Sequence, residues 1–227
     1  MNNKINFISE GSVTTPAGFK AAGITAGLKK SGKPDMALIV SDVPASAAGT
    51  FTTCKFAAAP VQICKKRIES GKPMRGVIVN SGNANACTGA QGLEDAETMC
   101  AMTARELGIT AEEVFVSSTG RIGVNMPMQV IEAGIIKAAA ALDADGGKVA
   151  SRAIMTTDTV PKSAAVSVEL SSGTVSIGGT TKGAGMIDPQ MAALHATMLC
   201  YITTDAEIAP ATLNKMLFGS VDTSFNR

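Results

Sequence analysis

The chain has 227 residues, of which 45% are apolar, and a formal net charge of +1. It is therefore long enough and apolar enough to bury one large core or two small ones. It has no long basic run, no Trp and a single Tyr, so a nucleic-acid-binding surface is not indicated.

The composition also argues against a membrane protein and against a metal or disulfide framework. No apolar run is long enough to span a bilayer, and the first residues lack the apolar core of a signal peptide. We therefore expect a cytoplasmic protein. Five Cys without a CxxC pair and a single His predict neither a zinc site nor a set of disulfides. Cys87 lies in a polar loop, but without a nearby His it is a weak candidate nucleophile.

The first third of the chain reads as a series of strands. Residues 11–35 are rich in Gly, Thr and Lys, which predicts turns and short edge strands. Apolar residues on both faces predict buried strands at 36–41 and 76–80. Further strands are expected at 51–53 and 60–64.

A loop of small and amide residues follows, Asn80-Ser-Gly-Asn-Ala-Asn-Ala-Cys-Thr-Gly-Ala-Gln-Gly92. Small residues let backbone approach backbone or a ligand closely, and Asn side chains cap local amides. The loop has neither the GxGxxG nor the GxxxxGK[ST] pattern. An active-site wall or a tight structural turn is therefore favoured over phosphate binding. A helix is expected next, at 93–107.

A second turn, Ser118-Thr-Gly-Arg-Ile-Gly123, follows a predicted strand at 113–117. Successive backbone N–H groups in such a turn can point at one spot, which is the arrangement that stabilises an oxyanion. From the residues alone, a plain turn is the simpler interpretation. Helical spacing then predicts an amphipathic helix at 126–142.

Hydroxyl side chains gather in the next segment. Residues 153–159 are expected to form a strand that ends in Met155-Thr-Thr-Asp-Thr159. Clustered hydroxyls suit hydrogen bonds to a small polar ligand, although such a run also caps turns. Alternating apolar residues predict a hairpin over 166–177.

The most informative stretch begins at Lys182-Gly-Ala-Gly-Met-Ile187 and continues through Ala196-Thr197. An apolar run at 198–202 predicts a buried strand, and a helix is expected at 207–218. Thr197 thus lies where a loop meets a core strand.

A Thr hydroxyl needs a base to act as a nucleophile. The sole His, His195, is one candidate. The other is the α-amine of Thr197 itself, whose pKa of roughly 7.7–8.0 leaves it partly unprotonated at neutral pH. The second route requires cleavage of the Ala196–Thr197 bond. The alternative is that Thr197 is only a hydroxyl at the start of a core strand.

Several of these motifs, in the same order, resemble one family. Lys182-Gly-Ala-Gly-Met-Ile187, Ala196-Thr-Met-Leu199 and Ile202-Thr-Thr-Asp-Ala206 are similar to the self-cleavage region of the ornithine acetyltransferase family (glutamate N-acetyltransferase, ArgJ). The loop at 80–86, Thr119-Gly120 and the Thr-rich segment at 155–159 have counterparts there too. The resemblance extends from about Gly11 to Arg227.

The resemblance implies an α+β fold, an αββα-type layered sandwich of the N-terminal-nucleophile kind. It implies self-cleavage before Thr197, so that residues 1–196 form an α chain and residues 197–227 the start of a β chain, assembled as an α2β2 heterotetramer. Thr197 would carry an acetyl group from N-acetylornithine to glutamate in arginine biosynthesis. Acetyl-CoA would be a second donor only in bifunctional members. No metal or organic cofactor is implied.

The resemblance also assigns the other site residues. Thr119 and Gly120 would form the oxyanion hole, and Lys182 would bind substrate. Thr156 would bind substrate as well, with Thr157 as the near alternative.

The chain departs from the family pattern in three places. The segment at 190–196 is longer than usual and contains His195, Arg121 replaces a common apolar residue, and family members continue past residue 227. Two alternatives therefore stay open: a non-catalytic or incomplete fragment that needs the missing half, and an amidase or aminopeptidase in which water accepts the acyl group.

Overall fold

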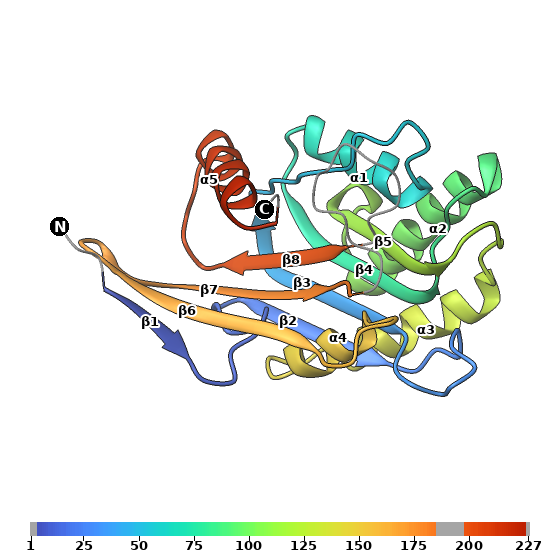
Figure 1. Ribbon diagram of the computed structural model, residues 1–227, viewed down its shortest axis with the longest axis horizontal. Helices are drawn as coiled ribbons and strands as arrows, with labels where there is room; N and C mark the ends of the chain where they lie inside the picture. The colour runs from blue at the N-terminus through green and yellow to red at the C-terminus, as the bar shows by residue number, and fades with distance from the viewer. Residues whose placement is uncertain (1–3, 185–197, 226–227) are drawn as a thin grey trace.

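The computed structural model describes residues 4–184 and 198–225, which form two four-stranded sheets and the helices around them (Figure 1). The first sheet has the order β2-β3-β4-β5 and the second has the order β1-β6-β7-β8. In the first sheet the strands are β2 (Phe19–Ile24), β3 (Met36–Ala45), β4 (Met74–Asn83) and β5 (Val114–Arg121). In the second they are β1 (Ile5–Ile8), β6 (Lys162–Leu170), β7 (Gly173–Lys182) and β8 (Leu199–Thr204).

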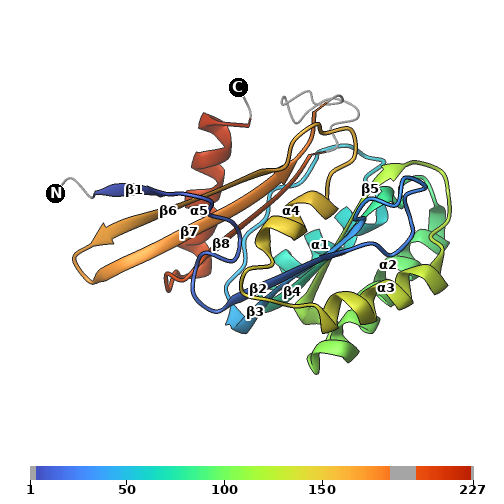
Figure 2. The ribbon, with the colours of Figure 1, turned by 90° about the horizontal axis from the view of Figure 1, so that it is seen from below.

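Three helices cover the outer face of the first sheet: α1 (Ala59–Glu69), α2 (Gly89–Leu107) and α3 (Met128–Ala140) (Figure 2). A 3₁₀ turn at Ala111–Glu113 leads into β5. Leu38 and Val40 point into this core, together with residues of all three helices. The period-two geometry of a strand sends alternate side chains to opposite faces, so β3 can serve two cores at once.

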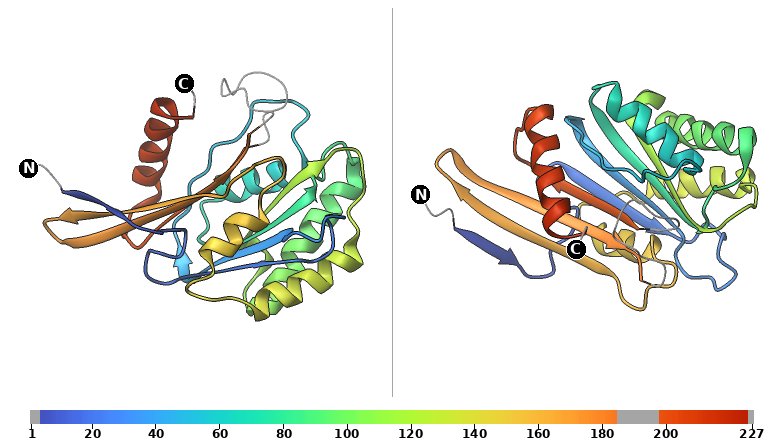
Figure 3. Two further views of the ribbon diagram at one scale, coloured as in Figure 1. Left: turned by 60° about the horizontal axis from the view of Figure 1, so that its bottom comes forward. Right: turned by 45° about the horizontal axis from the view of Figure 1, so that its top comes forward.

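The opposite face of the first sheet packs on the second sheet and on α4 (Gly147–Ala153), which lies between the two sheets. Ala37 and Ile39 of β3 enter this second core, where Leu199 and Tyr201 of β8 also pack. The result is an α+β layered sandwich, as expected. Helix α5 (Pro210–Thr223) lies beyond β8, apart from the other helices (Figure 3), and none of its described residues is buried.

Most of the predicted elements are confirmed, with shifted ends. These are the strands expected at 36–41, 76–80, 113–117 and 198–202, the hairpin at 166–177, and the helices at 93–107, 126–142 and 207–218. The strand at 198–202 is less enclosed than predicted, since Ile202 is exposed.

Three predicted strands are wrong. Residues 51–53 form no strand, and residues 60–64 belong to α1. Pro60 lies in the first turn of α1, where its missing N–H costs nothing, while Ile63, Cys64 and Arg67 are buried at helical spacing. Residues 153–159 also form no strand, because α4 ends at Ala153 and a turn held by Asp158 follows.

Within the described residues, no helix combines the length and the apolar character that crossing a bilayer requires.

Candidate active site

The ends of two parallel strands bring the two small-residue loops together. β4 and β5 run side by side in parallel, with Ser81 opposite Thr119 and Gly82 opposite Gly120. The carboxyl ends of parallel strands are the usual place for a site in sheets covered by helices. The end of β4 and the Thr119-Gly120 pair therefore lie side by side. Because β5 continues to Arg121, Thr119 and Gly120 belong to the strand and not to the predicted turn.

Gly120 is fixed at this point by the shape of its backbone. Its φ of +136° is one that other residues rarely adopt, and an added Cβ would lie 2.4 Å from the carbonyl carbon of Gly82. A side chain here would therefore push the end of β4 away from β5. Only glycine lets the two strand ends approach as closely as they do.

Lys182 reaches the same place from the second sheet. It is the last residue of β7, only 3% exposed, and its Nζ donates a hydrogen bond to Thr119 Oγ1 over 3.1 Å. Burial lowers the pKa of Lys182, Asp158 opposes this shift and Lys162 adds to it. The glycine-rich sequence that starts at Lys182 is typical of a flexible loop, but β7 continues to this lysine and holds it in the strand.

The bond between these residues has a direct chemical consequence. An ammonium group can only donate, so the Thr119 oxygen must accept. The hydroxyl proton of Thr119 is then available to a second acceptor in the site. Two residues that lie 63 positions apart in sequence, and on different sheets, thus form one polar group.

Asp158 ties the turn that carries Thr156 to the end of β7. Its carboxylate accepts hydrogen bonds from Lys162 Nζ (2.6 Å), Gly183 N (2.7 Å) and Thr156 N (3.3 Å). Burial opposes ionisation of Asp158, but these donors outweigh it and hold its pKa at about 2. The backbone N–H groups of Thr156 and of Gly183, the neighbour of Lys182, are therefore held on the same carboxylate. Sequence reasoning had assigned no specific role to Asp158.

The asparagine side chains of the loop at 80–92 form hydrogen bonds within the protein. Asn80 accepts from Ser118 Oγ and donates to the Asn83 carbonyl, at 2.6 Å and 2.9 Å. Asn83 donates to the carbonyls of Val124 and Asn125 and accepts from Asn85 N. All three asparagines are buried. Their amides hold the loop in shape, which fits a wall of the site better than a phosphate cradle.

A further wall comes from the loop between β2 and β3, which sequence reasoning had treated only as turns. The buried Asp35 carboxylate accepts backbone N–H groups from Ala26, Gly27, Leu28 and Lys29. The Asp35 carbonyl accepts Ser81 N at 2.8 Å, next to the strand ends described above. In the sequence, Asp35 is an isolated Asp directly before a buried strand. This pattern predicts that Asp35 caps a loop, but it does not indicate a functional site.

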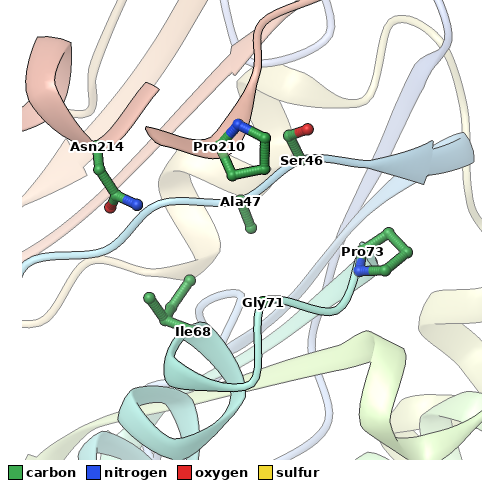
Figure 4. Close-up of a pocket in the computed structure, with 7 residues that line it drawn as sticks. All are labelled: Ser46, Ala47, Ile68, Gly71, Pro73, Pro210 and Asn214. Atoms are coloured by element: carbon green, nitrogen blue, oxygen red, sulfur yellow. The ribbon is translucent and has the colours of Figure 1, made fainter. Parts of the chain in front are cut away.

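The cysteines and the surface pocket lie elsewhere. Burial raises the pKa of Cys64 to about 12 and that of Cys100 to about 11, so neither is a ready thiolate. Cys87 is exposed. A small pocket lies where the start of α5 meets the segments beside β3 and α1 (Figure 4), and it contains no residue of the site. Its lining residues are Ser46, Ala47, Ile68, Gly71, Pro73, Pro210 and Asn214.

The model of the ArgJ family matches residues 20–227. The chain belongs to the ArgJ family. Curated ArgJ relatives named arginine biosynthesis bifunctional protein include that of Symbiobacterium thermophilum, 51% identical over 95% of this chain and 53% of its own length. That of Geobacillus stearothermophilus is 42% identical over 99% of this chain and 53% of its own length. The chain thus spans about half the length of the curated relatives it matches.

Two solved structures of the ArgJ family share the fold. The arginine biosynthesis bifunctional protein of Bacillus halodurans is 39% identical, with a TM-score of 0.78, and the match covers 88% of this chain and 100% of that one. The ornithine acetyltransferase of Mycobacterium tuberculosis, complexed with ornithine, is 37% identical, with a TM-score of 0.76, and the match covers 86% of this chain and 100% of that one.

The predicted nucleophile of this ArgJ-family chain, Thr197, lies outside the described residues, as do Ala196 and His195. The described chain resumes close to the site, because Leu199 pairs with Lys182 across β7 and β8. Among residues 4–184 and 198–225, no three His, Cys, Asp or Glu side chains are grouped so that they could hold a metal ion.

Proposed function

We propose that this chain is the self-cleaving portion of an N-terminal-threonine acetyltransferase, which moves an acetyl group from N-acetylornithine to glutamate. The observation that carries the proposal is the buried contact between Lys182 and Thr119, beside Gly120 and opposite Leu199. Only two positions separate Thr197 from Leu199 along the chain. Thr197 would thus lie near Thr119 and Gly120, which we propose as the oxyanion donors.

In the first step the Thr197 hydroxyl attacks the Ala196 carbonyl carbon. The peptide nitrogen leaves with a proton and becomes the free α-amine of Thr197, and water then hydrolyses the ester. This yields an α chain of residues 1–196 and a β chain that starts at Thr197. The match to the two solved structures covers 86–88% of this chain and the whole of each solved chain. The curated relatives, in contrast, are about twice as long as the region that this chain matches. A break in the polypeptide of these relatives would account for that difference, which supports the proposed cleavage.

In the second step the freed amine takes the Thr197 proton while the oxygen attacks the acetyl carbonyl of N-acetylornithine. The negative charge that develops on the carbonyl oxygen is stabilised by the Thr119 hydroxyl and the Gly120 N–H. Ornithine leaves with the proton, and the amine of glutamate then removes the acetyl group from the ester. Lys182 and Thr156 hold the amino-acid substrate. The Mycobacterium tuberculosis ornithine acetyltransferase was solved in complex with ornithine, which supports this substrate class.

The test follows a labelled acetyl group from N-acetylornithine. The chain is assayed alone and with a co-expressed C-terminal half taken from a relative. We expect labelled N-acetylglutamate, formed by ping-pong kinetics through an acetyl-enzyme. Labelled acetate alone would mean that water is the acceptor and that the protein is an amidase. No transfer in either form would mean a non-catalytic fragment. Supplying labelled acetyl-CoA instead shows whether it is a second donor.

A further inference from the structure

The charge and the contacts around Lys29 single it out among the residues of the loop between β2 and β3. Its Nζ donates to two backbone carbonyls, those of Pro34 and Met155, each over 2.7 Å. Met155 directly precedes Thr156, and it belongs to a segment 126 positions away from Lys29. The lysine therefore joins the loop at 26–35 to the turn that carries the predicted substrate-binding threonine.

The two segments that Lys29 joins are each held by an aspartate. On one side, Asp35 gathers four backbone N–H groups, including that of Lys29 itself over 2.9 Å. On the other side, Asp158 holds Thr156 N and Gly183 N on one carboxylate. A movement of Lys29 would release the Met155 carbonyl from the loop at 26–35.

Lys29 also belongs to a group of like charges. Its electrostatic neighbours include Lys182 and Lys33, balanced by Asp35 and Asp158. Burial is the main cause that lowers the pKa of Lys29, with the two lysines adding to the shift and the two carboxylates opposing it. The carboxylates of Asp35 and Asp158 therefore offset part of the cost of keeping Lys29 half-buried near the buried Lys182.

We propose that Lys29 is a positioning residue of this site, which fixes the backbone beside Thr156 through the Met155 carbonyl. The inference rests on the proposed function for its substrate and on the structure for its geometry. Lys29 need not touch the reacting atoms. Its effect is expected on substrate binding more than on the rate of the chemical step.

The experiment compares Lys29→Met with Lys30→Met, since Lys30 is exposed and adjacent in sequence. In the first arm, hydrogen exchange is measured on peptides that cover residues 150–160 of the chain as it stands. Losing hydrogen bonds from a charged donor should speed exchange there about tenfold in Lys29→Met, and leave it unchanged in Lys30→Met. Unchanged exchange in Lys29→Met would overturn the inference whatever the function is.

In the second arm, KM and kcat for N-acetylornithine are measured on the form that transfers acetyl groups. We expect KM to rise about tenfold in Lys29→Met with kcat within about threefold, since the lost contact serves binding. Lys29→Arg keeps the charge and should recover part of the loss in KM. Faster exchange with an unchanged KM would reduce Lys29 to a structural brace and would also overturn the inference. A wild-type protein without any transfer would instead count against the proposed function.

Discussion

Replacing Thr119 by valine is expected to lower kcat for acetyl transfer by about 10²–10³-fold, which is the usual cost of removing one oxyanion-hole donor. Valine keeps the shape of threonine but removes the hydroxyl that accepts from Lys182, and with it the proton that would be donated to the oxyanion. The oxyanion exists only in the transition state, so KM should change little. Steady-state kinetics with N-acetylornithine and glutamate provide the measurement.

Thr119→Ser is the matched control, because it keeps the hydroxyl and loses only a methyl group. It should retain activity within about tenfold of the wild type, well above Thr119→Val. Thr119 is fully buried, so the unfolding midpoints of both variants must be compared with the wild type. If valine and serine reduced kcat equally at equal stability, the hydroxyl would have no role in catalysis.

Replacing Asp158 by asparagine is expected to destabilise the fold by about 2 kcal/mol at pH 7, because charged hydrogen bonds to Lys162, Gly183 and Thr156 are weakened. The folded-state pKa of about 2 lies below the ordinary value of 3.8. A depressed carboxylate pKa stabilises the fold above the unfolded-state value, and this stability is lost as the pH falls toward the folded-state value.

The pH dependence distinguishes this charge from a packing effect. The difference in unfolding free energy between wild type and Asp158→Asn should shrink by about 1 kcal/mol between pH 7 and pH 3. Urea unfolding at both pH values measures it. Asp145→Asn, at an exposed position, should follow the wild type at both. Parallel wild-type and Asp158→Asn profiles would show that Asp158 does not stay ionised through its partners.

Local patterns predicted the central strands of the first sheet well, since β3 sends Leu38 to one core and Ile39 to the other. The same reasoning failed at 60–64, where a short apolar run fits a strand or a helix equally and Pro60 is compatible with the start of either. It also failed at 153–159. There the side chain of Asp158 accepts a hydrogen bond from the backbone of Thr156, which stabilises a turn where a strand was predicted.

The sequence identified candidate site residues, but it did not predict the contacts between them. Family motifs pointed to Thr119, Gly120 and Lys182, and the structure places all three at neighbouring strand ends. The burial of Lys182 and its bond to Thr119 depend on how two sheets face each other, which no local pattern encodes. Neither Lys29 nor Asp35 was assigned a role from the sequence, and only the fold brings them to the site.

Self-cleavage before Thr197 underlies every catalytic role proposed above, and the intact mass of the purified protein tests it. We predict two pieces split between Ala196 and Thr197, with the Thr197→Ala variant remaining a single chain. Both proteins are measured alone and with the C-terminal half of a relative co-expressed. A wild-type chain that remains uncut even with that half present, or a Thr197→Ala chain that is cut at the same bond, would contradict the proposed nucleophile.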